Sequence, residues 1–306
     1  PTDNVFTKVA SWEVNEPATA LAASVTWNKD VTCFGGTDGK FTIVANGGSE
    51  SYTYAAKLST VSTGHVFTPE PAAAEFQSSA EFVVPIGTYV IWVKDSIGCI
   101  VGGEGAGIPV DKYRVQIRQP KQVKFALAST DATCFGSATG KVTVNKLETE
   151  AISDAVGGLV TYTITVTGVD ASGVAVNITG TSTKTTGIVI SGVPASMTYG
   201  STVTNTYNVT VADGNGCSNS ATITVWQNKA IDAKLVKAAG AFVCPGDVTG
   251  VVEAQVTGGT GSYTYKLWRD GVAYQTTFDN VPSYIVQIGH AWKIEVKDAA
   301  GCSVFT

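Results

Sequence analysis

The chain alternates apolar and polar residues in short runs, a pattern typical of half-buried β-strands. In the first complete repeat, such runs cover residues 20–27, 40–45, 51–58, 87–95 and 113–119. Within 87–95, Tyr89, Ile91 and Val93 share one face, and Val90, Trp92 and Lys94 share the other. No segment of useful length has the 3.6-residue period of an amphipathic helix. The pattern therefore predicts an all-β protein, and it predicts that the strand face with Tyr89, Ile91 and Val93 points into the core.

Three motifs recur in the same order along the chain. The first begins at a cysteine and reads CFGGTDGKFTI from Cys33, CFGSATGKVTV from Cys134 and CPGDVTGVVEA from Cys244. The second is a glycine pair before a strand, at 47–54, 157–164 and 258–265. The third reads VKDSIGC, VADGNGC and VKDAAGC, and ends at Cys99, Cys217 and Cys302. Recurrence at this spacing indicates an array of one structural module.

The glycine pair invites a second interpretation, as a loop that binds phosphate. Such a loop needs a helix start and a Lys followed by Ser or Thr, because helix amides and an ammonium neutralise the phosphate. Neither follows GGTGSYTY at 258–265. We therefore interpret the pair as a turn that leads into a strand.

The repeats set the domain boundaries. We expect residues 1–17 to be the last strand of a preceding repeat, and 18–119, 120–229 and 230–306 to be three repeats, the third without its closing strand. About seven short strands per repeat, separated by Gly and Asp turns, predict immunoglobulin-like or PKD-like antiparallel β-sandwiches. The joints are very short, which predicts an extended rod. Tyr89 and its equivalent Tyr207 resemble a tyrosine corner, whereas Trp292 at the third position has no hydroxyl.

Composition narrows the classes of function. Charged residues make up 15% of the 306 residues, and the net charge is −5. This leaves no basic surface for nucleic acid, so we expect no nucleic-acid partner. No apolar run reaches the roughly 20 residues that cross a bilayer, and the chain does not open on a signal peptide.

The six cysteines fall two per repeat at equivalent positions. Zinc ligands are usually closely spaced, as in C-x-x-C, and no such spacing occurs here. We expect disulfides and therefore an extracytoplasmic location. Pairing within repeats, Cys33–Cys99, Cys134–Cys217 and Cys244–Cys302, is the favoured arrangement. Pairing between adjacent repeats is the alternative, because in an immunoglobulin-like topology the two cysteines of one repeat lie at opposite poles.

The ordered motifs C-F-G-x-x-x-G-K, G-G-x-x-x-Y-T-Y and V-x-D-x-x-G-C resemble the SprB-type repeats of giant surface adhesins of gliding Bacteroidetes. The second repeat departs from the pattern in NKLETEAISDAVGG, and the third in CPGDVTGVV. The resemblance implies a repetitive cell-surface filament that is exported by the type IX secretion system and carried by the gliding machinery. It also implies attachment to a substratum or surface polysaccharide, with neighbouring repeats of the same chain as further partners.

Candidate chemistry is sparse. The two histidines, His65 and His290, lie at non-equivalent positions, and no nucleophile elbow, zinc-protease motif or carboxylate pair is present. We expect no catalytic residues and no enzyme. Asp95, Asp213 and Asp298 precede the glycine of the third motif, where a carboxylate can hold a turn. Calcium bound by such an acid together with Asn215 is the alternative.

Trp92 and Trp226 fall on the outward register of their strands, where an aromatic side chain can stack on a sugar or pack under a loop. The glycine-rich insertion at 101–110 is a second candidate surface. The leading hypothesis is an adhesin stalk segment without catalysis. The alternatives are a tandem of carbohydrate-binding modules and an accessory array of a secreted enzyme.

Overall fold

The computed structural model describes residues 16–59, 67–105, 107–109, 111–148, 161–183, 186–238 and 244–306. Nearly all of the tail assigned to a preceding repeat, and His65, therefore lie outside the described residues. The described elements are β-strands, apart from one 3₁₀ turn, η1 (Ala73–Glu75). This confirms the all-β prediction. None of the described helical turns is long and apolar enough to cross a membrane.

The chain divides into two compact units. Unit 1 holds the first repeat up to Lys121, and unit 2 holds the described residues from Gln122 onward, which include the second and third repeats. Among the described strands, no sheet is shared between repeats.

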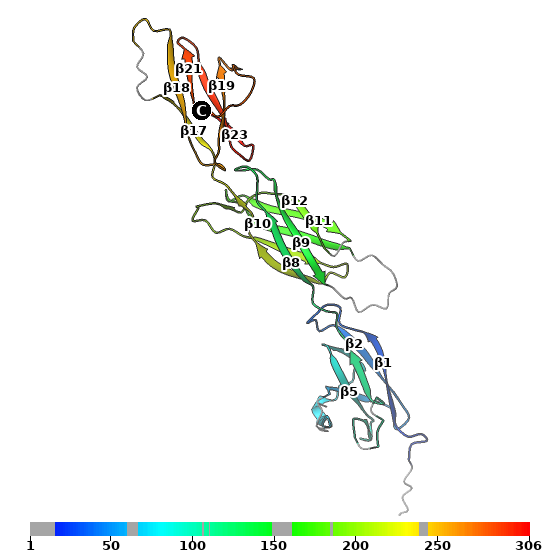
Figure 1. The fold of residues 1–306 in the computed structure, drawn as a ribbon. Helices are drawn as coiled ribbons and strands as arrows, with labels where there is room; N and C mark the ends of the chain where they lie inside the picture. Colours follow the sequence, from blue (N-terminus) through cyan, green and yellow to red (C-terminus); the bar gives the residue numbers. More distant parts are fainter. Residues whose placement is uncertain are drawn as a thin grey trace, which may run out of the picture. The chain divides into compact units, whose positions relative to one another are not determined.

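The first repeat consists of two antiparallel sheets (Figure 1). One has the order β1-β2-β4, with bounds Ala22–Lys29, Gly39–Asn46 and Glu81–Val84. The other joins β3 (Thr53–Leu58), β5 (Gly87–Lys94) and β6 (Ile100–Gly102), and β7 (Arg114–Ile117) also pairs with β5. Each of the five strands predicted from alternation begins and ends within two residues of the observed bounds of β1, β2, β3, β5 or β7.

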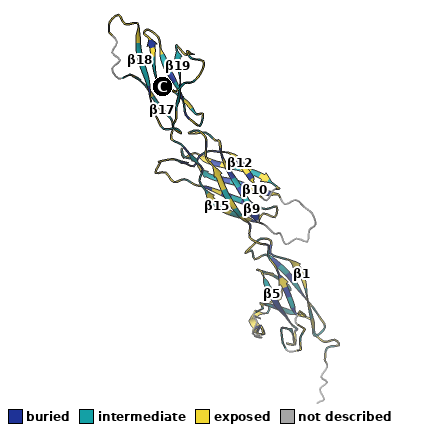
Figure 2. Ribbon diagram, in the orientation of Figure 1, coloured by how far each residue is buried: buried dark blue, intermediate teal, exposed yellow. Residues whose placement is uncertain are grey.

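The core of the first repeat lies between the two sheets. Phe41 and Ile43 of β2 face Tyr89, Ile91 and Val93 of β5, and all five side chains are buried. Buried positions alternate with less buried ones along β2, whereas β5 is buried at every position from Tyr89 to Val93 (Figure 2). The predicted inward face is confirmed, because only one register of a strand can place its apolar side chains against the opposite sheet.

The second repeat repeats this architecture. One sheet has the order β12-β9-β8, with bounds Ile188–Val193, Gly140–Glu148 and Lys124–Thr130. The other has the order β11-β10-β14-β15, with bounds Ala175–Ser182, Tyr162–Val169, Tyr207–Ala212 and Ser218–Ile223. A short parallel pair, β13 (Met197–Thr198) and β16 (Trp226–Gln227), closes its end.

The third repeat has the sheets β17-β18-β21 and β20-β19-β22-β23. The first sheet consists of β17 (Asp232–Lys237), β18 (Thr249–Thr257) and β21 (Ser283–Gln287). The second consists of β20 (Val272–Ala273), β19 (Thr264–Arg269), β22 (Trp292–Lys297) and β23 (Ser303–Phe305). The prediction placed no closing strand in this repeat, but a three-residue strand, β23, pairs with the second half of β22. It starts directly after the cysteine turn, as β15 does after Cys217.

The tyrosine corner is present in the first two repeats. The hydroxyls of Tyr89 and Tyr207 donate to the carbonyls of Pro85 and Pro194, each at 3.1 Å. In the third repeat, the indole Nε1 of Trp292 donates to the carbonyl of Gln287 at 2.8 Å. The third repeat thus differs at this position as predicted, and an N–H replaces the hydroxyl as donor.

Candidate functional site

The cysteine of the first motif opens a tight turn, which we call the first-loop turn. In each repeat, the amide three residues on donates to the cysteine carbonyl at 3.0 Å, from Gly36 to Cys33, from Ser137 to Cys134 and from Asp247 to Cys244. The third residue is glycine with positive φ, at 74° in Gly35, 70° in Gly136 and 100° in Gly246. A side chain would be strained there, which explains the invariant C-x-G spacing within this chain.

The last residues of a repeat close on its first-loop turn. The Gln119 side-chain oxygen accepts a hydrogen bond from the Gly35 amide at 2.9 Å, and the Gln227 oxygen accepts one from Gly136 at 2.7 Å. The first-loop cysteine therefore lies at the pole where the chain leaves the repeat.

The cysteine of the third motif ends a second turn, which we call the late turn. In Asp95, Asp213 and Asp298, Oδ1 accepts the amide of the cysteine four residues on, at 2.8, 2.9 and 2.9 Å. The Asn215 amide also donates to Asp213, at 2.9 Å. These carboxylates hold the turn, as one of the two interpretations predicts. Among the described residues, no group of three or more His, Cys, Asp or Glu gathers as metal ligands would.

The late turn is tied to the glycine pair and to the start of the repeat. Asp95 Oδ2 accepts the Ser49 amide at 3.1 Å, and the Gly48 amide donates to the carbonyl of Thr19 at 2.8 Å. Burial pushes the pKa of Asp95 up, but the amide bonds outweigh it and hold that pKa below its ordinary value. The late-turn cysteine therefore lies at the pole where the chain enters the repeat.

The third repeat builds the same corner. Asp298 Oδ2 accepts the Thr260 amide at 3.0 Å, and the Gly259 amide donates to Lys229 at 3.0 Å. The glycine pair thus makes backbone bonds with the entry segment, and its predicted role as a turn is confirmed.

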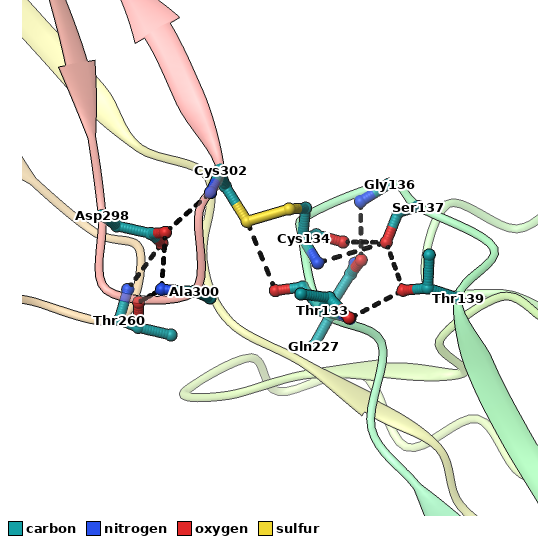
Figure 3. The surroundings of a disulfide bond; sticks show 10 residues. All are labelled: Thr133, Cys134, Gly136, Ser137, Thr139, Gln227, Thr260, Asp298, Ala300 and Cys302. Atoms are coloured by element: carbon teal, nitrogen blue, oxygen red, sulfur yellow. Dashed lines mark hydrogen bonds between the residues drawn. A yellow bond between two sulfur atoms is a disulfide. The ribbon is translucent and has the colours of Figure 1, made fainter. Parts of the chain in front are cut away.

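Within unit 2, the exit pole of one repeat meets the entry pole of the next. Cys134, in the first-loop turn of the second repeat, forms a disulfide with Cys302, in the late turn of the third (Figure 3), and their Cα atoms are 5.7 Å apart. Residues Thr133, Phe135, Lys229, Ile231, Asp298 and Val304 line a hollow of about 270 Å³ beside it. The bond braces the joint between two repeats.

This pairing corrects the favoured prediction. Cys134 bonds to Cys302 and not to Cys217, and Cys99 and Cys244 are free and exposed, so the within-repeat pairs are wrong. The predicted disulfide state is also wrong for Cys99 and Cys244, whereas Cys33 and Cys217 are each disulfide-bonded. The physical reason is that the two cysteines of a repeat lie at opposite poles of its sandwich.

Trp92 is not an exposed aromatic. It is 3% exposed and packs with Ala55 and Val90 beneath Phe76. The backbone of Gly103 lies over the indole, where a Cβ would come within 2.8 Å of Nε1. The outward face of β5 is thus covered by two other segments, and the surface-contact prediction for Trp92 is wrong.

Trp226 is only partly buried and belongs to an aromatic pair. Its ring stacks on that of Tyr199, with centroids 4.8 Å apart and planes 14° from parallel. Tyr199 is 46% exposed, and its hydroxyl donates to Asp131 at 2.8 Å, which raises the pKa of Tyr199. Of the two predicted tryptophans, only Trp226 remains a candidate for surface contact.

The glycine-rich insertion carries a residue that the sequence analysis missed. The Glu104 side chain is 5% exposed and pairs with Arg114 at 2.6 Å. It also accepts bonds from the Ser59 hydroxyl at 3.0 Å and from the amide and hydroxyl of Thr68 at 3.2 and 3.1 Å. Its only signal in the sequence is a lone acid ten residues before an arginine. This part of the insertion closes the repeat onto its own core.

Replacing Glu104 by Gln is expected to destabilise unit 1 by about 2 kcal/mol, because charge-assisted bonds to a buried carboxylate are lost. Desolvation raises the pKa of Glu104, but the hydrogen bonds from Thr68 and Arg114 outweigh it and hold that pKa below its ordinary value. A depressed folded pKa adds stability above the unfolded pKa, and that stability is lost as the pH falls through the folded value. The free energy of unfolding, measured with urea, should therefore fall more steeply between about pH 6 and 3 in the wild type than in Glu104→Gln.

Glu81→Gln is the matched control, because Glu81 forms an exposed ion pair with Lys40 at 2.6 Å. We expect it to cost less than about 1 kcal/mol. Equal losses for the two variants would contradict a special role for the buried pair.

Residues 28–56 match the family model of the SprB repeat. This stretch runs from the first-loop turn through the glycine pair, and it confirms the resemblance to SprB-type repeats there. No curated protein matches the chain.

Several solved structures are similar. The FN1-FN3 domains of chicken CNTN1 have 12% identity and a TM-score of 0.29, over 92% of this chain and 97% of that one. A tetra-tandem repeat in the extending region of a large adhesion protein has 14% identity and a TM-score of 0.24, over 94% and 73%. Dpr2 Ig1-Ig2 in complex with DIP-Theta Ig1-Ig3 has 10% identity and a TM-score of 0.28, over 94% and 98%.

The SprB match supports a repeat region of a cell-surface adhesin. The disulfides suit a domain outside the cytoplasm, where cysteine pairs persist.

Proposed function

We propose that the chain is a stalk segment of a large secreted adhesin, which gives reach and surface attachment without catalysis. The observation that carries the proposal is the SprB match at 28–56, together with the recurrence of the same turn geometry in all three repeats. That recurrence extends the family signal from one motif to the length of the array.

The disulfide at the joint favours a mechanical role. A bond between consecutive repeats adds a second covalent connection beside the main chain, so the joint resists bending and pulling. Tandem sandwiches braced in this way would form the extended rod that the short joints predict.

The export route and partners follow from the same family resemblance. In this proposal, the type IX secretion system exports the chain, and the gliding machinery carries it along the outer membrane. The substratum or a surface polysaccharide is the ligand, and no nucleic acid takes part.

A tandem of carbohydrate-binding modules is the second candidate, favoured by the stacked pair of the exposed Tyr199 and the partly buried Trp226. Aromatic faces of this kind stack on sugar rings. Binding to a glycan array that is lost in Trp226→Ala would favour this candidate over the stalk.

The test of the stalk proposal uses Fab fragments raised against the purified chain. They should label intact, unpermeabilised cells that produce the protein and lower attachment of those cells to glass several-fold relative to a non-immune Fab. Labelling that requires permeabilised cells, or full attachment by labelled cells, would overturn the proposal.

A further inference from the structure

One of the two free cysteines lies in a first-loop turn and the other lies in a late turn. Cys244 belongs to a first-loop turn and Cys99 to a late turn, and both are exposed. The bonded pair in unit 2 likewise joins a first-loop cysteine, Cys134, to a late-turn cysteine, Cys302.

The turns around the free cysteines match those around the bonded ones. The Asp247 amide donates to Cys244 at 3.0 Å, as the Ser137 amide does to Cys134. Asp95 accepts the Cys99 amide at 2.8 Å, as Asp298 accepts that of Cys302 at 2.9 Å. Each free thiol is thus presented by the same backbone geometry as a cysteine that forms the bond.

We propose that Cys244 and Cys99 are linkage points for further repeats of this type. Cys244 bonds to the late-turn cysteine of the repeat that follows it in an array, and Cys99 bonds to the first-loop cysteine of the repeat that precedes it. The inference rests on the proposed array function and adds to it a rule of pairing: first loop to the late turn of the next repeat.

Each bond forms by two thiol–disulfide exchanges with a disulfide oxidant such as oxidised glutathione. The first cysteine thiolate attacks the oxidant, which gives a mixed disulfide and releases one glutathione thiolate. The second cysteine thiolate attacks the protein sulfur of the mixed disulfide and releases the other. Two cysteine thiols are oxidised, and one glutathione disulfide is reduced to two thiols.

The test is a polypeptide in which two complete chains follow one another, with Thr306 of the first joined to Pro1 of the second. There are 62 residues from Cys244 to Thr306 and 99 more to Cys99 of the second copy, 161 in all, close to the separation of 168 in Cys134–Cys302. Two versions are compared. All bonded cysteines stay in both versions. Of the four free cysteines, the inner-pair tandem keeps Cys244 of the first copy and Cys99 of the second, through Cys99→Ser in the first copy and Cys244→Ser in the second. The outer-pair tandem has the converse substitutions.

Both tandems are oxidised with a glutathione redox buffer, alkylated and mapped without reduction by mass spectrometry. We expect the Cys244–Cys99 peptide in at least about nine of ten inner-pair molecules and a level at least tenfold lower in the outer-pair tandem. The Cys134–Cys302 bond in each copy reports correct folding and oxidation.

Free thiols in the inner-pair tandem would overturn the inference, and so would equal bonding in the two tandems, since that would indicate non-specific oxidation. Failure of the Cys134–Cys302 bond to form would overturn it too, because that bond is its template. The map is independent of cell labelling by Fab, so the adhesin function and the pairing rule can fail separately.

Discussion

Replacing Cys134 and Cys302 together by serine is expected to destabilise the third repeat by about 4 kcal/mol. While the second repeat is folded, the main chain attaches the third repeat to it at Lys229, and the disulfide attaches it again at Cys302. Together the two connections close a loop of 73 residues, from Lys229 to Cys302. In the chain-entropy model, a loop of this length restricts the unfolded state by about that amount. For a small domain, the loss corresponds to a decrease in Tm of at least about 15 °C.

Differential scanning calorimetry of the 306-residue chain measures this effect directly. The matched control is Cys99→Ser with Cys244→Ser, which removes one late-turn and one first-loop cysteine that are not bonded. The control should leave the transition within about 0.5 kcal/mol of the wild type. Equal shifts in the two double variants would contradict a bracing role for Cys134–Cys302.

The strands could be predicted because they depend on local patterns. Alternation fixes which residues of a strand face the opposite sheet, and Ile91, Val209 and Ile294 are buried at equivalent positions in the three repeats. The turn role of Asp95, Asp213 and Asp298 is equally local, since each of them accepts the amide of the cysteine four residues away.

Disulfide pairing could not be derived from spacing, because it depends on which poles of successive sandwiches meet. The two cysteines of a repeat are closer in sequence than Cys134 and Cys302, yet the fold places the latter pair together. The hydrogen bonds from Gly35 to Gln119 and from Gly48 to Thr19 reveal the poles, and neither contact has a sequence signature.

The burial of Trp92 also lay beyond the sequence. Alternation assigns Trp92 to the second face of β5, but whether that face meets solvent depends on what covers it. Phe76, from the segment with η1, and Gly103, from the insertion, cover it here. Segments of irregular structure have no periodicity from which such a cover could be predicted.

Trp92→Ala is therefore expected to destabilise unit 1 by about 4 kcal/mol, because removing a buried indole leaves a cavity beneath Phe76 and Gly103. Urea unfolding followed by circular dichroism measures the loss. Trp226→Ala is the matched control: its ring is only partly buried, so the variant loses less burial together with the stack on Tyr199, which is worth about 1 kcal/mol beyond burial.

The two tryptophan variants also separate packing from ligand binding. Trp92→Ala is expected to change the unfolding midpoint strongly, and any change in glycan binding should follow from loss of folded protein. A Trp92→Ala variant that kept its wild-type midpoint and lost binding to a sugar would contradict the buried position. Loss of binding in Trp226→Ala with a nearly unchanged midpoint would instead assign the ligand contact to the Tyr199–Trp226 pair. The comparison therefore decides whether the aromatic residues of this array serve its cores alone or also its surface.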